Sequence, residues 1–213
     1  MRLLPSYRTT TTFMLLVFVA SWIKPLWPLE QALHSSLTLI GFVALWWYRR
    51  HYPLSERDYL LIALFIAAHC IAARWLYSNV PYERWMQSAM GISLNQVLGW
   101  QRNHFDRLVH LLYGFCLTPP IAAHVIRRYR QSCRCGFLVA ITAIMVTSLW
   151  YEWFEWLIAI TLSPGQAEAY NGQQGDMWDA HKDMLTATLG SLLWWLHYRR
   201  QRGKTGEEAP CTT

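Results

Sequence analysis

Acidic residues and histidine recur at helical spacing in three stretches of the sequence. In each stretch two such residues lie three or four positions apart, which places both side chains on one face of a helix. The residues are Asp106 and His110, Glu152 and Glu155, and Asp179 and Asp183. Carboxyl groups so placed can act as general acids and bases, and carboxylates together with imidazole suit a divalent transition metal.

Two sets of candidate site residues follow from these stretches. Carboxylates brought together raise one another's pKa unless a cation or a bound metal compensates, and Arg74, Arg107 and Lys182 can supply part of that charge. The candidate catalytic residues are Glu152, Glu155, Asp179 and Asp183. The candidate metal ligands are Asp106, His110, Glu152, Asp179 and Asp183. The cofactor is left open beyond a divalent metal cation, and so is the question whether the protein is an enzyme.

The elements that must position these residues are membrane helices. Hydrophobic residues make up 54% of the chain and charged residues only 15%, whereas soluble domains average about 25% charged residues. A transmembrane helix needs about 20 mainly apolar residues, and six segments meet or approach this length. They are Thr10–Trp27, Leu29–Tyr48, Tyr59–Tyr77, Phe105–Ile126, Phe137–Leu162 and Met184–Tyr198. The sequence predicts an all-α membrane protein, a bundle of six transmembrane helices in one domain over residues 1–200, followed by a short polar, disordered tail at 201–213.

The basic residues predict the orientation of this bundle. Thirteen of the 19 lysines and arginines fall in the N-terminus, the second and fourth connections and the C-terminal tail. With six spans these segments share one side, and basic loops are cytoplasmic. We therefore expect a multi-pass protein of the bacterial inner membrane with both termini in the cytoplasm. The net charge of +6 is explained in this way, and no nucleic-acid partner is expected.

This topology places the three acidic stretches at one depth. They lie in the outer halves of the last three spans, and Gly114 in the fourth span permits a close helix approach. The longest connection, Ser78–Asn103, contains a mixed segment, Tyr82–Leu98, that is predicted to lie on the membrane surface as an amphipathic helix. Cys133 and Cys135 are expected to be plain thiols.

Three motifs carry a resemblance to a known family. They are residues 102–110 (RNHFDRLVH), 151–156 (YEWFEW) and 175–184 (GDMWDAHKDM). On these motifs the chain resembles the YjdF-like family of bacterial inner-membrane proteins, over most of its length. The resemblance implies a multi-pass inner-membrane protein but no particular activity. The six acidic and histidine positions match the family pattern, whereas His181 is often Gln there and Lys182 varies.

A fainter resemblance is to the VanZ-like family. It rests on Asp179, Asp183 and Gly190, after an acidic residue late in the preceding helix. It implies action at the cell envelope, on glycopeptide or lipid intermediates.

Three functions remain open from the sequence. The first is a protein that binds or processes an envelope lipid or a lipid-linked substrate in a periplasm-facing acidic and histidine pocket. The second is a small proton- or cation-coupled transporter, in which the same carboxylates carry the ion. The third is a structural or assembly factor with a buried ionic network. The partners expected are the lipid bilayer and either an envelope lipid or a small ion, and the oligomeric state is unknown.

Overall fold

The computed structural model describes residues 4–161, 170 and 173–201 of the chain. Helix is the only regular secondary structure in these residues, which confirms the all-α class. The helices are α1 (Tyr7–Ser21), α2 (Pro28–His51), α3 (Glu56–Arg74), α4 (Tyr82–Met90), α5 (Leu94–Leu98), α6 (Phe105–Tyr129), α7 (Cys133–Thr161), α9 (Asp179–Leu192) and α10 (Trp195–Gln201).

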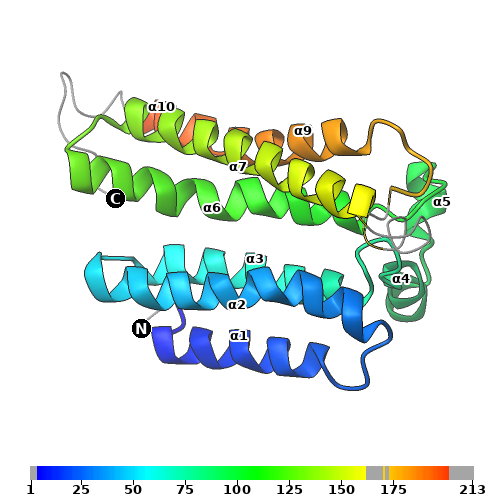
Figure 1. Cartoon of the computed structure of the whole chain (residues 1–213). Coiled ribbons are helices and arrows are strands. Elements are labelled where there is room, and N and C mark those ends of the chain that lie inside the picture. The colour runs from blue at the N-terminus through cyan, green and yellow to red at the C-terminus, as the bar shows by residue number, and fades with distance from the viewer. Residues whose placement is uncertain (1–3, 162–169, 171–172, 202–213) are drawn as a thin grey trace.

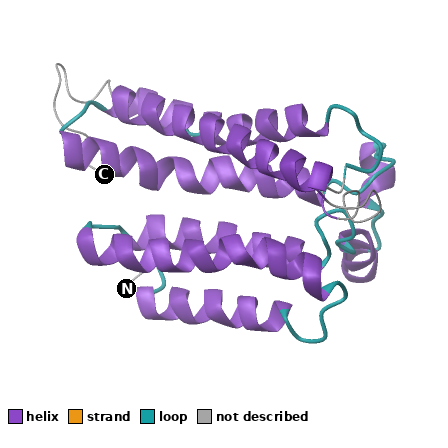
Figure 2. Ribbon diagram, in the orientation of Figure 1, coloured by secondary structure: helices purple, strands orange, loops and turns teal. Residues whose placement is uncertain are grey.

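The long helices form two groups that meet along α3 and α6 (Figure 1). In the first group α1 and α2 pack on α3; in the second, α6 packs on α7 and α9, and α7 also packs on α9 and α10. The short helices α4 and α5 lie at the end of the bundle where α6 and α9 begin. Figure 2 shows the α2–α3 and α6–α7 connections at the opposite end. The starts of α6 and α9 and the last turns of α7 thus lie at one end, as the sequence predicts.

Several helix ends differ from the predicted boundaries for local reasons. Helix α3 begins where the Ser55 hydroxyl accepts a hydrogen bond from the Asp58 amide at 3.0 Å. It ends at Arg74, because Leu76 and Tyr77 adopt left-handed φ angles of 47° and 57°. Gly91, with φ of 68°, divides the predicted surface helix into α4 and α5. The last predicted span is divided between α9 and α10.

Glycine allows α6 and α9 to pack closely. A Cβ atom on Gly114 would lie 1.8 Å from the carbonyl oxygen of Ala187. The Thr118 hydroxyl of α6 lies 2.8 Å from the Ser191 hydroxyl of α9, and both are buried. The predicted close approach at Gly114 is confirmed, and it draws the acidic faces of the two helices together.

Two helices in the described residues, α6 and α7, are long and apolar enough to cross a membrane. Helix α7 exposes apolar surface along its length: Trp150, Trp153 and Trp156 are each more than half exposed. Six spans and their orientation remain predictions. The tail from residue 202 onward and Leu162 lie outside the described residues. Cys135 is a free thiol, whereas Cys133 is disulfide-bonded, so the expectation of a plain thiol at Cys133 is wrong.

Candidate functional site

Ion pairs between arginine and aspartate join the starts of α6 and α9. Arg102 lies 2.7 Å from Asp179 and 3.2 Å from Asp176. Arg107 pairs with the same two carboxylates, at 3.3 Å from Asp176. Lys182 completes this outer layer by donating a hydrogen bond to Asp176 at 2.6 Å. Charged groups of both signs are thus paired above the deeper carboxylates.

The connections around this layer hold it in place. The Asn103 amide donates to the Gln174 side chain at 3.0 Å, and the Gln174 side chain donates back to the Asn103 carbonyl at 3.1 Å. The Tyr82 hydroxyl of α4 accepts from the His104 amide at 3.2 Å and donates to Asn95 at 2.8 Å. The α4–α5 pair therefore fixes the entry of the chain into α6.

The charges of the outer layer shift the pKa values of two groups that lie outside the long helices, Asp176 and His104. The hydrogen bond from Lys182 holds the pKa of the Asp176 carboxyl below its ordinary value. Burial, aided by the positive charges of Arg102 and Arg107, lowers the pKa of the His104 imidazole. Asp176 is therefore ionised and His104 neutral at neutral pH.

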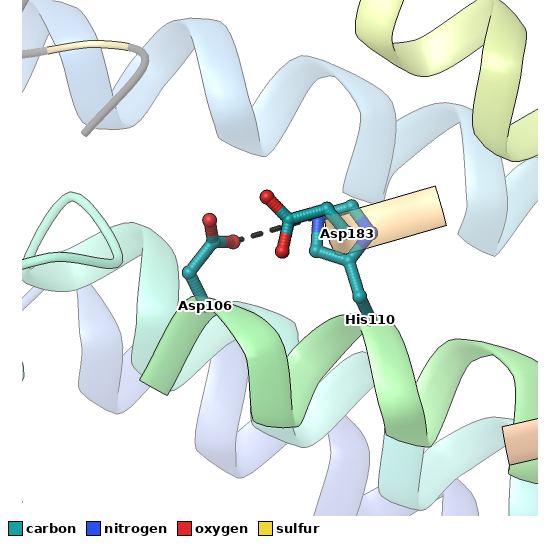
Figure 3. A group of neighbouring side chains, drawn as sticks. All are labelled: Asp106, His110 and Asp183. Carbon is teal, nitrogen blue, oxygen red and sulfur yellow. Dashed lines mark ion pairs between the residues drawn. The ribbon is translucent and has the colours of Figure 1, made fainter. Parts of the chain in front are cut away.

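A buried group of acids and histidine lies beneath this layer. Asp106 and His110 on α6 and Asp183 on α9 turn their side chains toward one another, as Figure 3 shows. One ligand atom from each lies within 4.8 Å of the others. His110 Nε2 is 3.5 Å from Asp106 and 4.0 Å from Glu152 of α7. We call Asp106, His110, Glu152 and Asp183 the acid–histidine cluster; all four residues are buried.

A cavity of about 210 Å³ adjoins this cluster. Its walls come from α2, α3, α6, α7 and the turn after α3, and His110 and Tyr151 lie on its side toward the cluster. No Asp, Glu, Lys or Arg is among its described lining residues. The cavity is therefore an uncharged space, lined largely by apolar and aromatic side chains, that shares one residue, His110, with the cluster.

Comparison with known proteins places this chain in a family. The model of the family described as "Predicted membrane protein (DUF2238)" matches residues 7–204. This chain belongs to the DUF2238 family. It is also 33% identical, over 147 residues, to the inner membrane protein YjdF of Escherichia coli (strain K12); the match covers 67% of this chain and 65% of the relative. No solved structure gives a significant match. The predicted family and the inner-membrane location are confirmed, and the resemblance to the VanZ-like family stays a prediction.

The structure of this DUF2238 protein brings most of the predicted site residues together. Asp106, His110, Glu152 and Asp183 form the cluster, whereas Asp179 faces Arg102 and Arg107 in the outer layer. Glu155 lies one turn after Glu152 on α7 and is half-buried. Their catalytic and metal-binding roles remain predictions.

Two arginines, Arg74 and Arg102, have contacts that the sequence does not predict. Arg74 does not join the acids; its guanidinium donates to the carbonyl oxygens of Ser21 at 2.7 Å and Ile23 at 2.8 Å, where it ties α3 to the end of α1. Arg102 takes the place expected for Arg74. Arg102 lies in the connection before α6 and not in a helix, so helical spacing could not predict that it faces the acids, although it stands five residues before Arg107.

Proposed function

We propose that this DUF2238 protein is a six-span protein of the inner membrane that binds an envelope lipid or lipid-linked substrate. The polar part of the ligand would meet the acid–histidine cluster, and its hydrocarbon part would enter the cavity. The observation that carries the proposal is that His110 belongs both to the cluster and to the cavity wall. An amphipathic ligand needs this direct junction between a polar, charged site and an apolar one.

The size of the cavity limits what it can hold. Pockets for drug-sized ligands measure about 300–1,000 Å³, so a cavity of about 210 Å³ would take a segment of one acyl or prenyl chain. The rest of such a ligand would lie in the bilayer. This suits a protein that engages a lipid from the membrane better than one that encloses a soluble molecule.

Processing of the bound lipid would use the carboxyl groups of α7. Ionisable groups inside a membrane protein are costly, face the protein interior and commonly mark function. Glu152 is buried beside His110, at 4.0 Å, so proton transfer between them would need a closer approach or one bridging water. Glu155, one turn away, is the second candidate acid or base. Asp179, paired with Arg102 and Arg107, would position those arginines near a negatively charged headgroup.

Filling the cavity tests the proposal. A Cβ atom on Gly41, which lines the cavity, would meet nothing within 4 Å, so a larger side chain can start at this position without a backbone clash, and the phenyl ring of Gly41→Phe is expected to occupy the cavity. Ile40→Phe is the matched control, because Ile40 is its neighbour on α2 and is 63% exposed. Lipids retained by each protein purified in mild detergent would be extracted and identified by mass spectrometry.

The proposal expects the native protein and Ile40→Phe to retain the same lipid and Gly41→Phe to lose it. Equal lipid content in all three proteins would contradict it. The transporter alternative instead expects ion flux in proteoliposomes that Glu152→Gln abolishes. The structural alternative expects Glu152→Gln to lower the yield of folded protein and to leave the bound lipids unchanged.

A further inference from the structure

We infer that the acid–histidine cluster is a binding site for one divalent first-row transition-metal ion, held by Asp106, His110 and Asp183 with Glu152 as a fourth ligand. This goes beyond the proposed lipid function, because it requires no lipid. It names a ligand that the cluster would bind whether or not the cavity is occupied.

The spacing of the donor atoms supports the assignment. Zinc bonds to nitrogen and oxygen of about 2.0–2.2 Å in a tetrahedral site leave neighbouring ligand atoms about 3.3–3.6 Å apart. His110 Nε2 lies 3.5 Å from Asp106 Oδ1, within that spacing. The distance of 4.0 Å from Glu152 to His110, and the limit of 4.8 Å that holds among Asp106, His110 and Asp183, would have to shorten as these side chains move inward onto an ion.

Two carboxylate oxygens of the cluster lack hydrogen bonds. Glu152 Oε1 and Asp183 Oδ1 are buried and make no hydrogen bond within the part of the chain that the structure describes. The side chains of these residues are only 7% and 4% exposed. A buried carboxylate oxygen without a hydrogen bond is costly, and Glu152 Oε1 is directed at the same imidazole nitrogen that faces Asp106. A cation placed between them would satisfy Glu152 Oε1 and would share Asp183 Oδ1 with Arg107 Nε, which already lies 3.2 Å from that oxygen.

The surrounding charges leave room for a dication. Three cationic side chains, Arg102, Arg107 and Lys182, face the carboxylates at this end of the bundle in the described residues. Five carboxylates face them or the imidazole of the cluster. These are Asp106, Glu152, Asp176, Asp179 and Asp183. Carboxylates therefore outnumber the cationic side chains here, and a divalent cation would add compensating positive charge.

The donor set selects the class of metal. Imidazole with carboxylates suits zinc, manganese and iron, whereas calcium and magnesium prefer oxygen ligands alone. Arg107 supports the site from outside, because its Nε lies 3.2 Å from Asp183 while another of its nitrogens pairs with Asp179. Such partners orient metal-binding carboxylates.

Metal titration of the purified protein tests the inference. The protein would be stripped with a chelator in detergent and titrated with Zn²⁺ and Mn²⁺, with Mg²⁺ for comparison. Bound metal would be measured by elemental analysis after desalting. One equivalent of a transition ion is expected, and Asp183→Asn or His110→Gln should weaken its binding at least tenfold.

Asp176→Asn is the matched control, because it removes the same charge at the same end of the bundle but lies outside the cluster. It should retain the full equivalent. Absence of bound metal from the native protein, or equal losses in Asp176→Asn and Asp183→Asn, would overturn the inference.

A second measurement needs no variant. Co²⁺ bound in the native protein should give the strong visible absorption of a tetrahedral site, and the spectrum of the hydrated ion alone would count against the site. The metal and lipid results can be separated with Gly41→Phe. This variant is expected to bind metal normally, so loss of lipid alone or of metal alone would identify which proposal fails.

Discussion

Arg107 Nε lies 3.2 Å from a carboxylate oxygen of Asp183 and so links α6 to α9. The two side chains are 11% and 4% exposed, and the same guanidinium also pairs with Asp179. Removing one member of a buried ion pair leaves the other charge without compensation. This pair therefore links the outer layer of ion pairs to the acid–histidine cluster. It also contributes to the stability of the bundle.

Replacement of Arg107 by Gln should strongly destabilise the protein. Loss of one partner from a buried pair costs about 3–5 kcal/mol. Thermal unfolding in detergent, followed by circular dichroism, would measure the effect. Lys182→Gln is the control: Lys182 is 51% exposed, and exposed pairs contribute about 0–1 kcal/mol. Similar unfolding temperatures for the two variants would show that the Arg107 pairs are not structural.

The sequence indicates which helix faces of α6 and α9 carry the acids, but it does not indicate every arginine that pairs with them. Helical spacing places Asp106 with His110 and Asp183 with Asp179, and Gly114 explains why α6 and α9 approach closely. Those features are local, so a single sequence reveals them. The position of Arg102 is different, because it depends on how the α5–α6 connection folds against Asp179.

Long-range packing accounts for the other differences. Arg74 is expected to offset the charge of the acids, because the sequence places it near the same end of the bundle. Its guanidinium instead donates to carbonyl oxygens at the end of α1. The cavity is lined by four helices whose relative placement no periodicity reveals. The place of Gly41 and Tyr151 in the cavity wall is therefore known only from the tertiary structure.

Helix packing at Gly114 should tolerate no larger side chain. A Cβ atom at this position would lie only 1.8 Å from the Ala187 carbonyl oxygen, so Gly114→Leu would prevent α6 and α9 from packing. We expect loss of monodisperse protein in size-exclusion chromatography. Gly41→Ala, where a Cβ meets nothing within 4 Å, is the matched control and should behave as the native protein. A well-folded Gly114→Leu protein would contradict the close packing.

The ion pairs of Asp176 should give a measurable dependence on pH. The folded-state pKa of Asp176 is lowered by its hydrogen bond with Lys182, so its contribution to stability is present above the unfolded-state pKa. That unfolded value is about 3.9, and the contribution is lost as pH falls through the lower folded value. The unfolding temperature of native protein should exceed that of Asp176→Asn at pH 6, and the difference should shrink as the pH falls below about 4.

The test of this linkage is the difference between the two proteins at each pH. Carboxyls that share no cation with Asp176 titrate nearly equally in both proteins, so they cancel in the comparison; Asp179 and Asp183, which share arginines with it, contribute to the measured difference. A difference that is already absent at pH 6, or that grows as the pH falls, would show that Asp176 is not stabilised in its ionised form.

The orientation of the bundle can be tested with reporters at its two ends. The basic α2–α3 and α6–α7 connections lie at the end opposite α4 and α5 (Figure 2), and basic loops remain in the cytoplasm. Green fluorescent protein fused after the C-terminus should therefore fluoresce, and alkaline phosphatase fused there should be inactive. Alkaline phosphatase inserted at Gly91, the exposed junction of α4 and α5, should be active. The reverse pattern would place the acid–histidine cluster toward the cytoplasm and exclude a substrate from the outer leaflet.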